Sequence, residues 1–369
     1  MLSRIYIDNY RAFVKFEHWF ESTQLLIGGN GSGKSSLLSV LFAVRQLVAR
    51  GDSVDTFNFL TNRTAWLSQP EQIFEFDVTL DDTRYVYRLE IEPWGEPIHA
   101  RIAKESVTVD GQPLMEFSKG EVHLYDDSFE FRVSYPFDSL RSALATISEA
   151  PGRKRLYALR LWFGGLLCFQ LNPFAMGALA EREDEYPNVN LSNFASWYRH
   201  LVQAFPKENQ AFIASLVESI PGFRHLSLRL HSERSRGVLA EFESPDGKRS
   251  IDFYLGELSD GQRCLIALYA ILHFVVAKGG TVLIDEPDNF IALREIQPWL
   301  MAVSDMVESS ANSQVVLISH HPELINQWAA SCGYQLEREG AGPIHVKRFQ
   351  MDADATLSPA ELVARGWND

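Results

Sequence analysis

The sequence predicts an α/β protein with a mixed β-sheet, an antiparallel β subdomain and a helical lobe. A strand over Gln24 to Ile27 enters a glycine cluster, and a helix with apolar residues at helical spacing follows over about 33–50. Residues 73–133 alternate apolar and polar side chains between turns such as Asp110-Gly111, which is typical of antiparallel hairpins. Residues 153–220 have the pattern of helices and stop at Pro221-Gly222. Alternating strands and helices at both ends of the chain complete the prediction.

The remaining elements follow from the same patterns. The segment around Ile5 and Ile7 predicts a first strand, and Gly51 ends the helix after the glycine cluster. Further along, we predict strands at about 225–231, 237–243, 249–255, 281–286, 314–321 and 344–349, a long apolar helix over 264–277, and helices near 292–308 and 358–365.

Composition sets limits on the function. The chain has 369 residues, of which 46% are hydrophobic, enough for one large domain or two modest ones with real cores. A net charge of −14 keeps the protein soluble and does not attract nucleic acid or anionic membranes broadly. We interpret the basic run Arg153 to Arg155 as a solvated helix start, although DNA remains a possible partner.

Cysteine usage and hydropathy favour a cytoplasmic protein. The three cysteines are far apart and form no CxxC pair, so neither a zinc site nor a disulfide framework is indicated. The N-terminal residues lack the apolar core of a signal peptide. The longest apolar stretch, 264–277, suits a buried helix better than a membrane span, so we expect no membrane association.

A phosphate-binding loop is the most specific motif in the sequence. Residues 28–35 read GGNGSGKS between a predicted strand and a predicted helix. Glycines let backbone N–H groups turn toward phosphate oxygens, and the helix N-terminus adds its dipole. Lys34 would reach the β- and γ-phosphates, and Ser35 would bind Mg²⁺ that accompanies ATP. The predicted ATP-binding residues of the loop and helix start are Gly28, Asn30, Gly31, Ser32, Gly33, Lys34, Ser35 and Ser36.

Two acidic residues end the apolar strand 281–286. Asp285 suits Mg²⁺, directly or through water, and Glu286 suits a general base that activates the attacking water. Taken alone, the pair could equally be helix-capping acids before Pro287. Because a phosphate loop occurs in the same chain, we favour the catalytic interpretation of Asp285 and Glu286.

The order of motifs carries a family resemblance. LSDGQ at 258–262 precedes a long helix, which Ser259 can cap, while Gly261 leaves its backbone N–H open to an anion. The order of phosphate loop, LSDGQ, apolar strand with DEP, and apolar strand with SHH resembles the ABC-type ATPases. The resemblance implies that Ser259, Asp260, Gly261 and Gln262 act in trans on the nucleotide of a second subunit. It also implies that His320, rather than its neighbour His321, contacts the γ-phosphate and the catalytic water.

Segments near both ends of the chain indicate which subgroup of the ABC-type ATPases the sequence resembles. IDNYRAF at 7–13 resembles the start of SMC/RecF-like ATPases, which implies that Arg11 lies near the nucleotide phosphates. The segments DEPD and ISHHPELI resemble bacterial "AAA family ATPase" proteins of ABC type found in phage-defence operons. The sequence has no heptad run for a coiled coil and no CxxC hook. The pair Asp352 and Asp354 matches a nuclease DxD, but we interpret it as a polar turn.

Several positions depart from the ABC pattern. Asp260 replaces the second glycine of LSGGQ, and Ala292 stands where an aspartate is usual. The glutamine that reaches the metal is ambiguous. Gln69 is our prediction, and Gln170 in FQLNP is the alternative.

The resemblance implies a single ATPase head over 1–369. Lobe I covers about 1–150 and 275–369 with a hairpin subdomain at about 70–135, and helical lobe II covers about 151–274. One half-site per chain implies a homodimer or higher assembly closed by ATP. The leading hypothesis is an ATPase that controls a partner effector, such as a nuclease encoded nearby, in phage defence. The alternatives are a RecF/SMC-like DNA-repair ATPase and an ATP-gated scaffold with little turnover.

Overall fold

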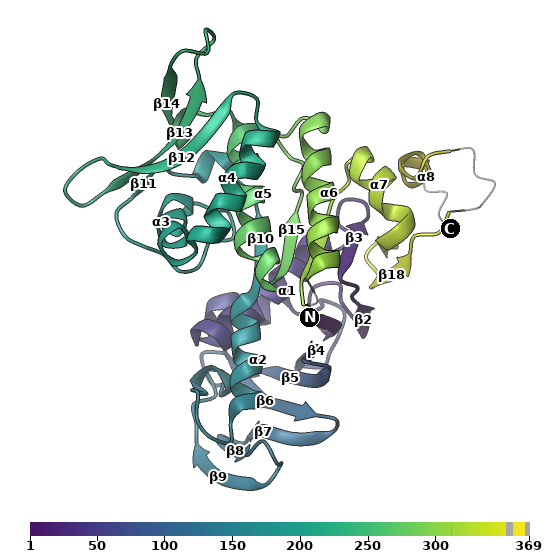
Figure 1. The fold of residues 1–369 in the computed structure, drawn as a ribbon. Helices are drawn as coiled ribbons and strands as arrows, with labels where there is room; N and C mark the ends of the chain where they lie inside the picture. The colour runs from purple at the N-terminus through teal and green to yellow at the C-terminus, as the bar shows by residue number, and fades with distance from the viewer. Residues whose placement is uncertain (311, 352–356, 366–369) are drawn as a thin grey trace. The chain divides into compact units, whose positions relative to one another are not determined.

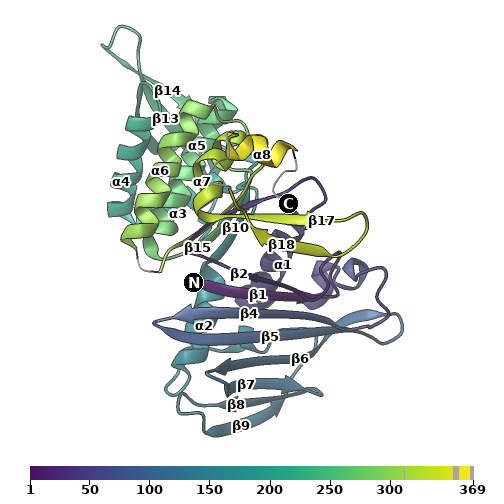
Figure 2. The ribbon, with the colours of Figure 1, turned by 90° about the vertical axis from the view of Figure 1, so that its right-hand side faces the viewer.

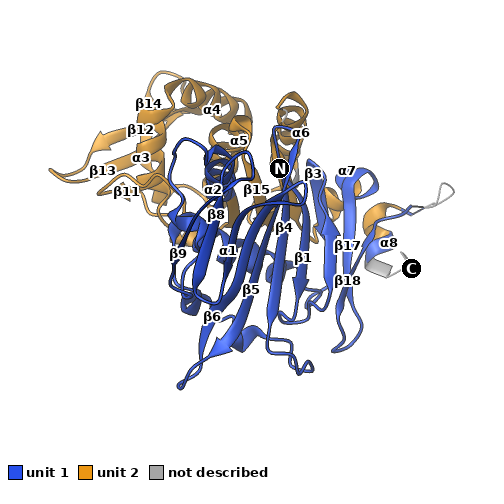
Figure 3. Ribbon diagram, turned by 90° about the horizontal axis from the view of Figure 1, so that it is seen from below, with its two compact units in different colours: residues 1–166, 328–357, 362–369 blue, residues 167–327, 358–361 orange. Residues whose placement is uncertain are grey.

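The protein divides into two compact units. The computed structural model describes residues 1–310, 312–351 and 357–365. One unit comprises residues 1–166, 328–357 and 362–369, and the other comprises residues 167–327 and 358–361 (Figure 3). The phosphate loop lies in the first unit, and LSDGQ, Asp285, Glu286 and His320 lie in the second.

An eight-stranded antiparallel sheet forms most of the first unit (Figure 2). Its strand order is β2-β1-β4-β5-β6-β7-β8-β9. The strands are β1 (Leu2–Asp8), β2 (Phe16–Trp19), β4 (Gln72–Leu80), β5 (Thr83–Trp94), β6 (His99–Val109), β7 (Gln112–Ser118), β8 (Glu121–Tyr125) and β9 (Phe131–Pro136). The predicted hairpins over 73–133 are therefore confirmed.

Alternation of side chains explains why this sheet forms. In β4, Phe74, Phe76 and Val78 are fully buried, while the residues between them contribute to the polar face. The tight turn between β6 and β7 places both Asp110 (φ 49°) and Gly111 (φ 79°) at positive φ, as a two-residue hairpin requires.

Helix α2 (Lys154–Gly165) covers the apolar face of this sheet. The ring of Phe163 meets Phe76 and Tyr87 edge-on, with centroids 5.7 and 5.1 Å apart. The start of the helix is held as well, because the backbone N–H groups of Lys154 and Arg155 donate to the carboxylate of Asp127 at 3.1 and 3.0 Å.

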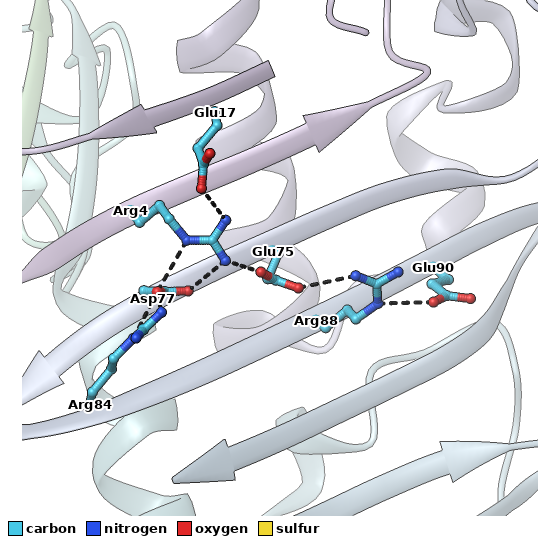
Figure 4. Close-up of polar contacts among 7 residues, drawn as sticks. All are labelled: Arg4, Glu17, Glu75, Asp77, Arg84, Arg88 and Glu90. Atoms are coloured by element: carbon cyan, nitrogen blue, oxygen red, sulfur yellow. Dashed lines mark hydrogen bonds and ion pairs between the residues drawn. The ribbon is translucent and has the colours of Figure 1, made fainter. Parts of the chain in front are cut away.

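The polar face of the sheet carries a network of ion pairs. Arg4 on β1 contacts Glu17 on β2 and Glu75 and Asp77 on β4 (Figure 4). The Asp77 side chain is fully buried and is also paired with Arg84. A buried carboxylate is tolerable only when paired, so this network fixes the register of β1 against β4. That register in turn places the residues that follow β1, including Arg11.

A second group of elements in the first unit carries the phosphate loop. It comprises β3 (Thr23–Ile27), α1 (Lys34–Arg45) with a π-helical continuation (Gln46–Arg50), β17 (Gly333–Arg338) and β18 (Ile344–Arg348), with short 3₁₀ turns at Val54–Phe57, Leu60–Asn62 and Leu144–Thr146. β17 is parallel to β3 and antiparallel to β18. The predicted helix over 33–50 and its stop at Gly51, which has φ 69°, are confirmed.

The second unit contains a parallel core. β10 (Leu166–Gln170) neighbours β15 (Thr281–Asp285), which pairs in parallel with β16 (Gln314–Ile318). All residues of β15 and β16 are buried, as expected for parallel strands. The helices are α5 (Asp260–Phe274) and α6 (Leu293–Ser309), with 3₁₀ turns at Pro173–Ala175, Leu255–Glu257 and Val276–Lys278.

A smaller sheet and two helices complete the second unit (Figure 1). The elements are β11 (Leu179–Ala180), α3 (Phe194–Ala204), α4 (Pro206–Ser219), β12 (Phe223–Leu230), β13 (Arg236–Glu243) and β14 (Ser250–Tyr254). β13 pairs antiparallel with β12 on one side and with β11 and β14 on the other. Helices α7 (Pro322–Cys332) and α8 (Pro359–Arg365) cross the boundary between the units in sequence.

The prediction of helices throughout 153–220 is wrong over 166–193, which contains β10, a 3₁₀ turn and β11 but no α-helix. LLCFQ is a short apolar run, and periodicity does not distinguish a buried strand from a buried helix over such a length. The sequence analysis also did not predict α7 or β17. Asp352 and Asp354 lie outside the described residues.

Within the described part of the chain, one helix passes a length-and-composition test for a membrane span. This helix, Asp260–Lys278, has a mean hydropathy of 1.3, and 67% of it is buried in the protein. From Cys264 to Phe274 every side chain is buried, which is the property of a core helix predicted from the sequence.

Candidate nucleotide-binding and catalytic site

The phosphate loop has a backbone that only glycine can adopt at two positions. Gly28 has φ 153°, and a Cβ there would lie 2.5 Å from the carbonyl oxygen of Leu336 on β17. Gly33 has φ 103° and a Cβ on it would collide with Ile344 on β18. Both glycines are thus required by close packing of the loop against the β17–β18 hairpin as well as by φ.

Lys34 begins α1 and holds its ammonium group over the loop. Its Nζ donates to the carbonyl oxygens of Gly28 at 2.5 Å and Gly29 at 3.0 Å. The first turn of α1 contains no acidic residue. A lysine ammonium at a helix N-terminus free of acids is an environment that favours a bound anion.

Arg11 reaches the same helix end from the loop after β1. Its backbone N–H donates to the Asn62 carbonyl at 2.5 Å, and its Nε donates to Asn62 Oδ1 at 3.0 Å. These bonds hold Arg11 at φ 51°, and its Nη1 donates to Ser36 Oγ at 3.0 Å. The structure therefore brings Arg11 together with the loop helix, and Asn62, which the sequence analysis did not single out, positions it.

In the second unit, Glu286 and His320 form a close pair. The backbone N–H of Glu286 donates to the Ile318 carbonyl at 2.7 Å and the residue has φ 51°. This conformation directs Oε1 to within 2.7 Å of His320 Nδ1. Oε2 is buried and has no hydrogen-bond partner among the described residues. A carboxylate with one oxygen oriented by a histidine and the other available is arranged as a general base.

His321 has a different environment from His320. Ser319 Oγ donates to Asp288 Oδ1 at 2.8 Å and accepts from the His321 backbone N–H at 2.9 Å. The Nδ1 of His321 accepts from the backbone N–H of Glu323 at 3.2 Å, in the first turn of α7. His321 is engaged in capping that helix, so His320 is the histidine available to Glu286.

The two candidate glutamines lie in different surroundings. Gln170, at the end of β10, places its side-chain nitrogen 3.5 Å from Oδ2 of Asp285, which is 4% exposed. Gln69 belongs to the first unit, where its side-chain Nε2 donates to Asp8 Oδ2 at 3.3 Å and its backbone carbonyl accepts from Asn9 Nδ2 at 2.9 Å. Rotation of the Gln170 amide would present its oxygen beside the Asp285 carboxylate, which is the donor type that Mg²⁺ prefers.

LSDGQ forms the start of α5 through a capping box. The backbone N–H of Gln262 donates to Ser259 Oγ at 3.3 Å, and Gln262 Oε1 accepts from the backbone N–H of Ser259 at 3.1 Å. A Cβ on Gly261 would lie 2.7 Å from the carbonyl oxygen of Phe290, so this position requires glycine for close packing.

Asp260 is paired with a residue that the sequence analysis missed. Its carboxylate accepts from Arg263 one turn along α5, and the Arg263 Nη1 also donates to the Pro173 carbonyl at 2.5 Å. Pro173 lies three residues after Gln170. Arg263 therefore neutralises Asp260 and ties the start of α5 to the segment that follows β10. The i, i+3 spacing of Asp260 and Arg263 was the available sequence signal.

Comparison with known proteins identifies the family. A family described as "AAA domain, putative AbiEii toxin, Type IV TA system" matches residues 25–326. The chain belongs to this AAA family. The comparison with curated proteins found no match.

Solved structures agree on the fold. The chain is similar to the "SmcHead bound to the C-winged helix domain of ScpA", with 14% identity, coverage of 94% of this chain and 98% of that chain, and a TM-score of 0.56. It is also similar to the Smc head domain from Pyrococcus furiosus bound to the C-terminal domain of ScpA, with 13% identity, 94% and 96% coverage, and a TM-score of 0.51. The predicted fold class, an ABC-type ATPase head, is confirmed by these matches. AAA domains, the family to which the chain belongs, are typically ATPases.

The environments of the two glutamines predict different phenotypes. Gln170→Ala is expected to raise the Mg²⁺ concentration needed for half-maximal ATP hydrolysis by about 10- to 100-fold, the usual cost of losing a group that supports a metal site. Gln69→Ala, the matched control, is expected to leave it unchanged. Hydrolysis rates measured across a Mg²⁺ titration check this, and the opposite ranking of the two variants would assign the metal to Gln69.

Proposed function

We propose that this chain hydrolyses ATP with Mg²⁺ at a site completed by a second copy of itself. The observation that carries the proposal is the 2.7 Å contact between Glu286 and His320, which leaves Oε2 of Glu286 buried and without a partner among the described residues. A buried carboxylate oxygen without a partner is costly unless a ligand completes it. A water molecule to be activated is such a ligand.

The phosphate loop supports the proposal through its charge and shape. Lys34, Arg11 and the backbone N–H groups of the loop supply positive charge for the triphosphate. The oxygen-bearing side chains of Ser35, Asp285 and Gln170 have the chemistry that Mg²⁺ prefers. Mg²⁺ bound there would neutralise the charge that develops on the phosphates.

Glu286 and His320 would have different roles in the chemical step. Glu286 takes the proton from the attacking water through Oε2, while the imidazole N–H of His320 holds Oε1 and fixes the orientation of the carboxylate. The water oxygen forms a bond to the γ-phosphorus, and the bond from that phosphorus to the β–γ bridging oxygen breaks. A positioned general base contributes about 10²- to 10⁴-fold to such a step.

The motif order implies that Ser259 and Gly261 serve the nucleotide of a second subunit. Both lie at the N-terminus of a 15-residue helix, where the helix dipole favours an anion. The fold is similar to an SMC head that was solved bound to a domain of ScpA, and this supports association of the head with another protein chain. We therefore propose a homodimer or higher assembly, in which each chain comprises a hairpin-bearing lobe I and a helical lobe II.

The biological role that we propose is control of a partner effector in phage defence, in the cytoplasm. The family description, which refers to a toxin of a type IV toxin–antitoxin system, supports a role in a two-component operon. A DNA-repair role is the second candidate, and the resemblance of residues 7–13 to the start of RecF-like ATPases favours it. No effector chemistry was recognised in the sequence, so an effector would be a separate protein.

Trapping the ATP-bound assembly tests the ATPase proposal. Glu286→Gln keeps the shape of the side chain but removes the base, so hydrolysis is expected to fall by at least about 100-fold while ATP still binds. Light scattering after size exclusion is expected to show a dimer only with Mg²⁺ and ATP. Lys34→Ala is the control and should remain a monomer. An unchanged mass for Glu286→Gln with ATP would contradict the shared site, and wild-type turnover no higher than that of Lys34→Ala would indicate a scaffold.

The pairing of Asp260 predicts a second effect on the shared site. Arg263→Ala would leave the Asp260 carboxylate uncompensated where an anion must bind, and a charge-assisted hydrogen bond is worth about 1.5–3 kcal/mol. We expect the ATP concentration for half-maximal hydrolysis to rise about 10-fold or more. Adding Asp260→Gly to Arg263→Ala should restore most of the loss. If the double variant stays as impaired, Arg263 acts through Pro173 and not through charge.

Plating assays test the biological role. Cells carrying the chain with its flanking genes are expected to form fewer plaques than cells without them, and Lys34→Ala is expected to abolish that difference because the phosphate loop no longer holds ATP. Equal plaque numbers for wild type and the empty strain across a phage panel would contradict the defence role. Sensitivity to DNA damage after deletion of the gene would instead support the repair candidate.

A further inference from the structure

Strand β14 (Ser250–Tyr254) is an open edge of the smaller sheet in the second unit (Figure 1). It pairs with β13 along one side, and among the described residues no strand pairs with its other side. All of its residues are exposed. Proteins normally protect such an edge, because its unpaired backbone groups can pair with another chain. An unprotected edge strand therefore indicates a docking surface.

A row of aromatic side chains runs from the core of this sheet to β14. Phe223, which is 2% exposed, meets Phe242 edge-on with ring centroids 5.6 Å apart, and Phe242 meets Phe253 at 5.9 Å. Ile251 lies opposite Phe242 on the same face. Phe253 is 37% exposed and Ile251 is 42% exposed, so the apolar face continues past the part that the protein covers. Exposed apolar surface of this kind is typical of an interaction site.

The backbone of β14 presents donors and acceptors to a further strand. The Tyr254 N–H donates to Glu257 Oε2 at 2.6 Å, so it points away from β13. Because the N–H groups of successive residues in a strand alternate in direction, those of Ser250 and Asp252 also point away from β13. These N–H groups and the carbonyl groups of the same residues form the edge with which an incoming strand would pair.

The charges around β14 favour an acidic partner. Three nearby carboxylates are each held within the unit: Asp252 by Arg229, Glu243 by Arg224, and Asp246 by the backbone N–H of Lys248 at 3.1 Å. Lys248 and Arg249 directly precede β14, and in the part of the chain that the structure describes neither side chain forms an ion pair. The open edge thus begins with two basic groups that an acidic segment would neutralise.

We propose that β14 binds an extended segment of a partner protein, which adds to the sheet as a further strand. The segment has apolar side chains at alternate positions, which cover Ile251 and Phe253, and acidic side chains that pair with Lys248 and Arg249. The inference rests on the proposed function, because the partner is the effector that the ATPase would control.

β14 is connected directly to the proposed shared site. The 3₁₀ turn Leu255–Glu257 follows it, and Ser259 then begins α5. The hydrogen bond from Tyr254 to Glu257 joins the strand to that turn. A partner bound on β14 would therefore lie beside the segment that we propose closes on the nucleotide, so each event can influence the other.

Selection from a displayed library of random peptides, about ten residues long, on the full chain tests this docking strand. We expect enriched peptides that alternate apolar and polar residues and carry acidic residues. Phe253→Ser is expected to weaken their binding about 10- to 150-fold, because one large apolar side chain is no longer covered. Ser250→Pro removes one outward N–H, keeps the ladder to β13, and should weaken binding about 2- to 12-fold. Lys248→Glu combined with Arg249→Glu should weaken the acidic peptides most at low salt.

Met301→Ser is the matched control. Met301 is 62% exposed on α6 of the same unit, and its replacement should leave peptide binding unchanged. An unchanged circular dichroism spectrum shows that each variant is folded. Peptides that are insensitive to Phe253→Ser and Ser250→Pro, or that have apolar residues at helical spacing, would overturn the inference. Wild-type dimers that form without ATP and are lost in Phe253→Ser would assign the strand to a second copy and overturn it as well.

Plaque assays separate this inference from the proposed role. Where the chain with its flanking genes protects cells, Phe253→Ser is expected to lose protection but keep ATP hydrolysis, while Met301→Ser keeps both. Full protection with Phe253→Ser would contradict docking of the effector on β14. If the wild type gives no protection, the proposed role fails, and the peptide selection still decides whether β14 is a docking strand.

Discussion

The proposed catalytic pair, Glu286 and His320, depends on the register between β15 and β16. In this parallel pair Asp285 lies opposite Ile318, and one further hydrogen bond joins the Glu286 N–H to the Ile318 carbonyl at 2.7 Å. Both strands thus end at the same edge, so Glu286 and His320 are adjacent although 34 residues separate them. A slip of one residue would move every side chain of the displaced strand to the opposite face and separate Glu286 from His320. Two uninterrupted buried strands make that slip costly, and apolar burial in the core thereby fixes a polar site at its edge.

Close packing plays the same role in the first unit. The phosphate loop needs Gly28 and Gly33 for φ, but β17 and β18 approach so closely at these positions that larger residues are excluded sterically as well. The hairpin that contributes this constraint comes from the other end of the chain. The loop therefore obtains its shape from distant residues, while its ability to bind an anion comes from local ones, chiefly Lys34 and the N-terminus of α1.

The sequence predicted most elements because their patterns are local. The hairpins over 73–133, the loop helix and the strands before Asp285 and His320 needed only periodicity and turn residues. The sequence analysis did not predict β10 and β17, because strands this short are defined by their pairing and show no distinctive hydrophobic periodicity. The sequence analysis also missed the contacts of Gln170 with Asp285 and of Asn62 with Arg11, because pairing between distant segments depends on tertiary topology. The pair of Arg263 and Asp260 is local, and its i, i+3 spacing could have predicted it. Motif order predicted the candidate catalytic groups, and the tertiary structure revealed the residues that orient them.

The start of α5 shows how closure and helix capping compete. Ser259 Oγ already accepts from the Gln262 N–H, and Gln262 Oε1 accepts from the Ser259 N–H. An incoming phosphate would need the same donors, so it must replace interactions that stabilise the helix by about 1 kcal/mol each. Asp260 adds a negative charge there, which Arg263 offsets. The net attraction for a phosphate is therefore smaller than a bare helix N-terminus would give. Because the start of α5 would attract a phosphate only weakly, the proposed association of two subunits would need several contacts to form together. A switch controlled by a nucleotide requires this property.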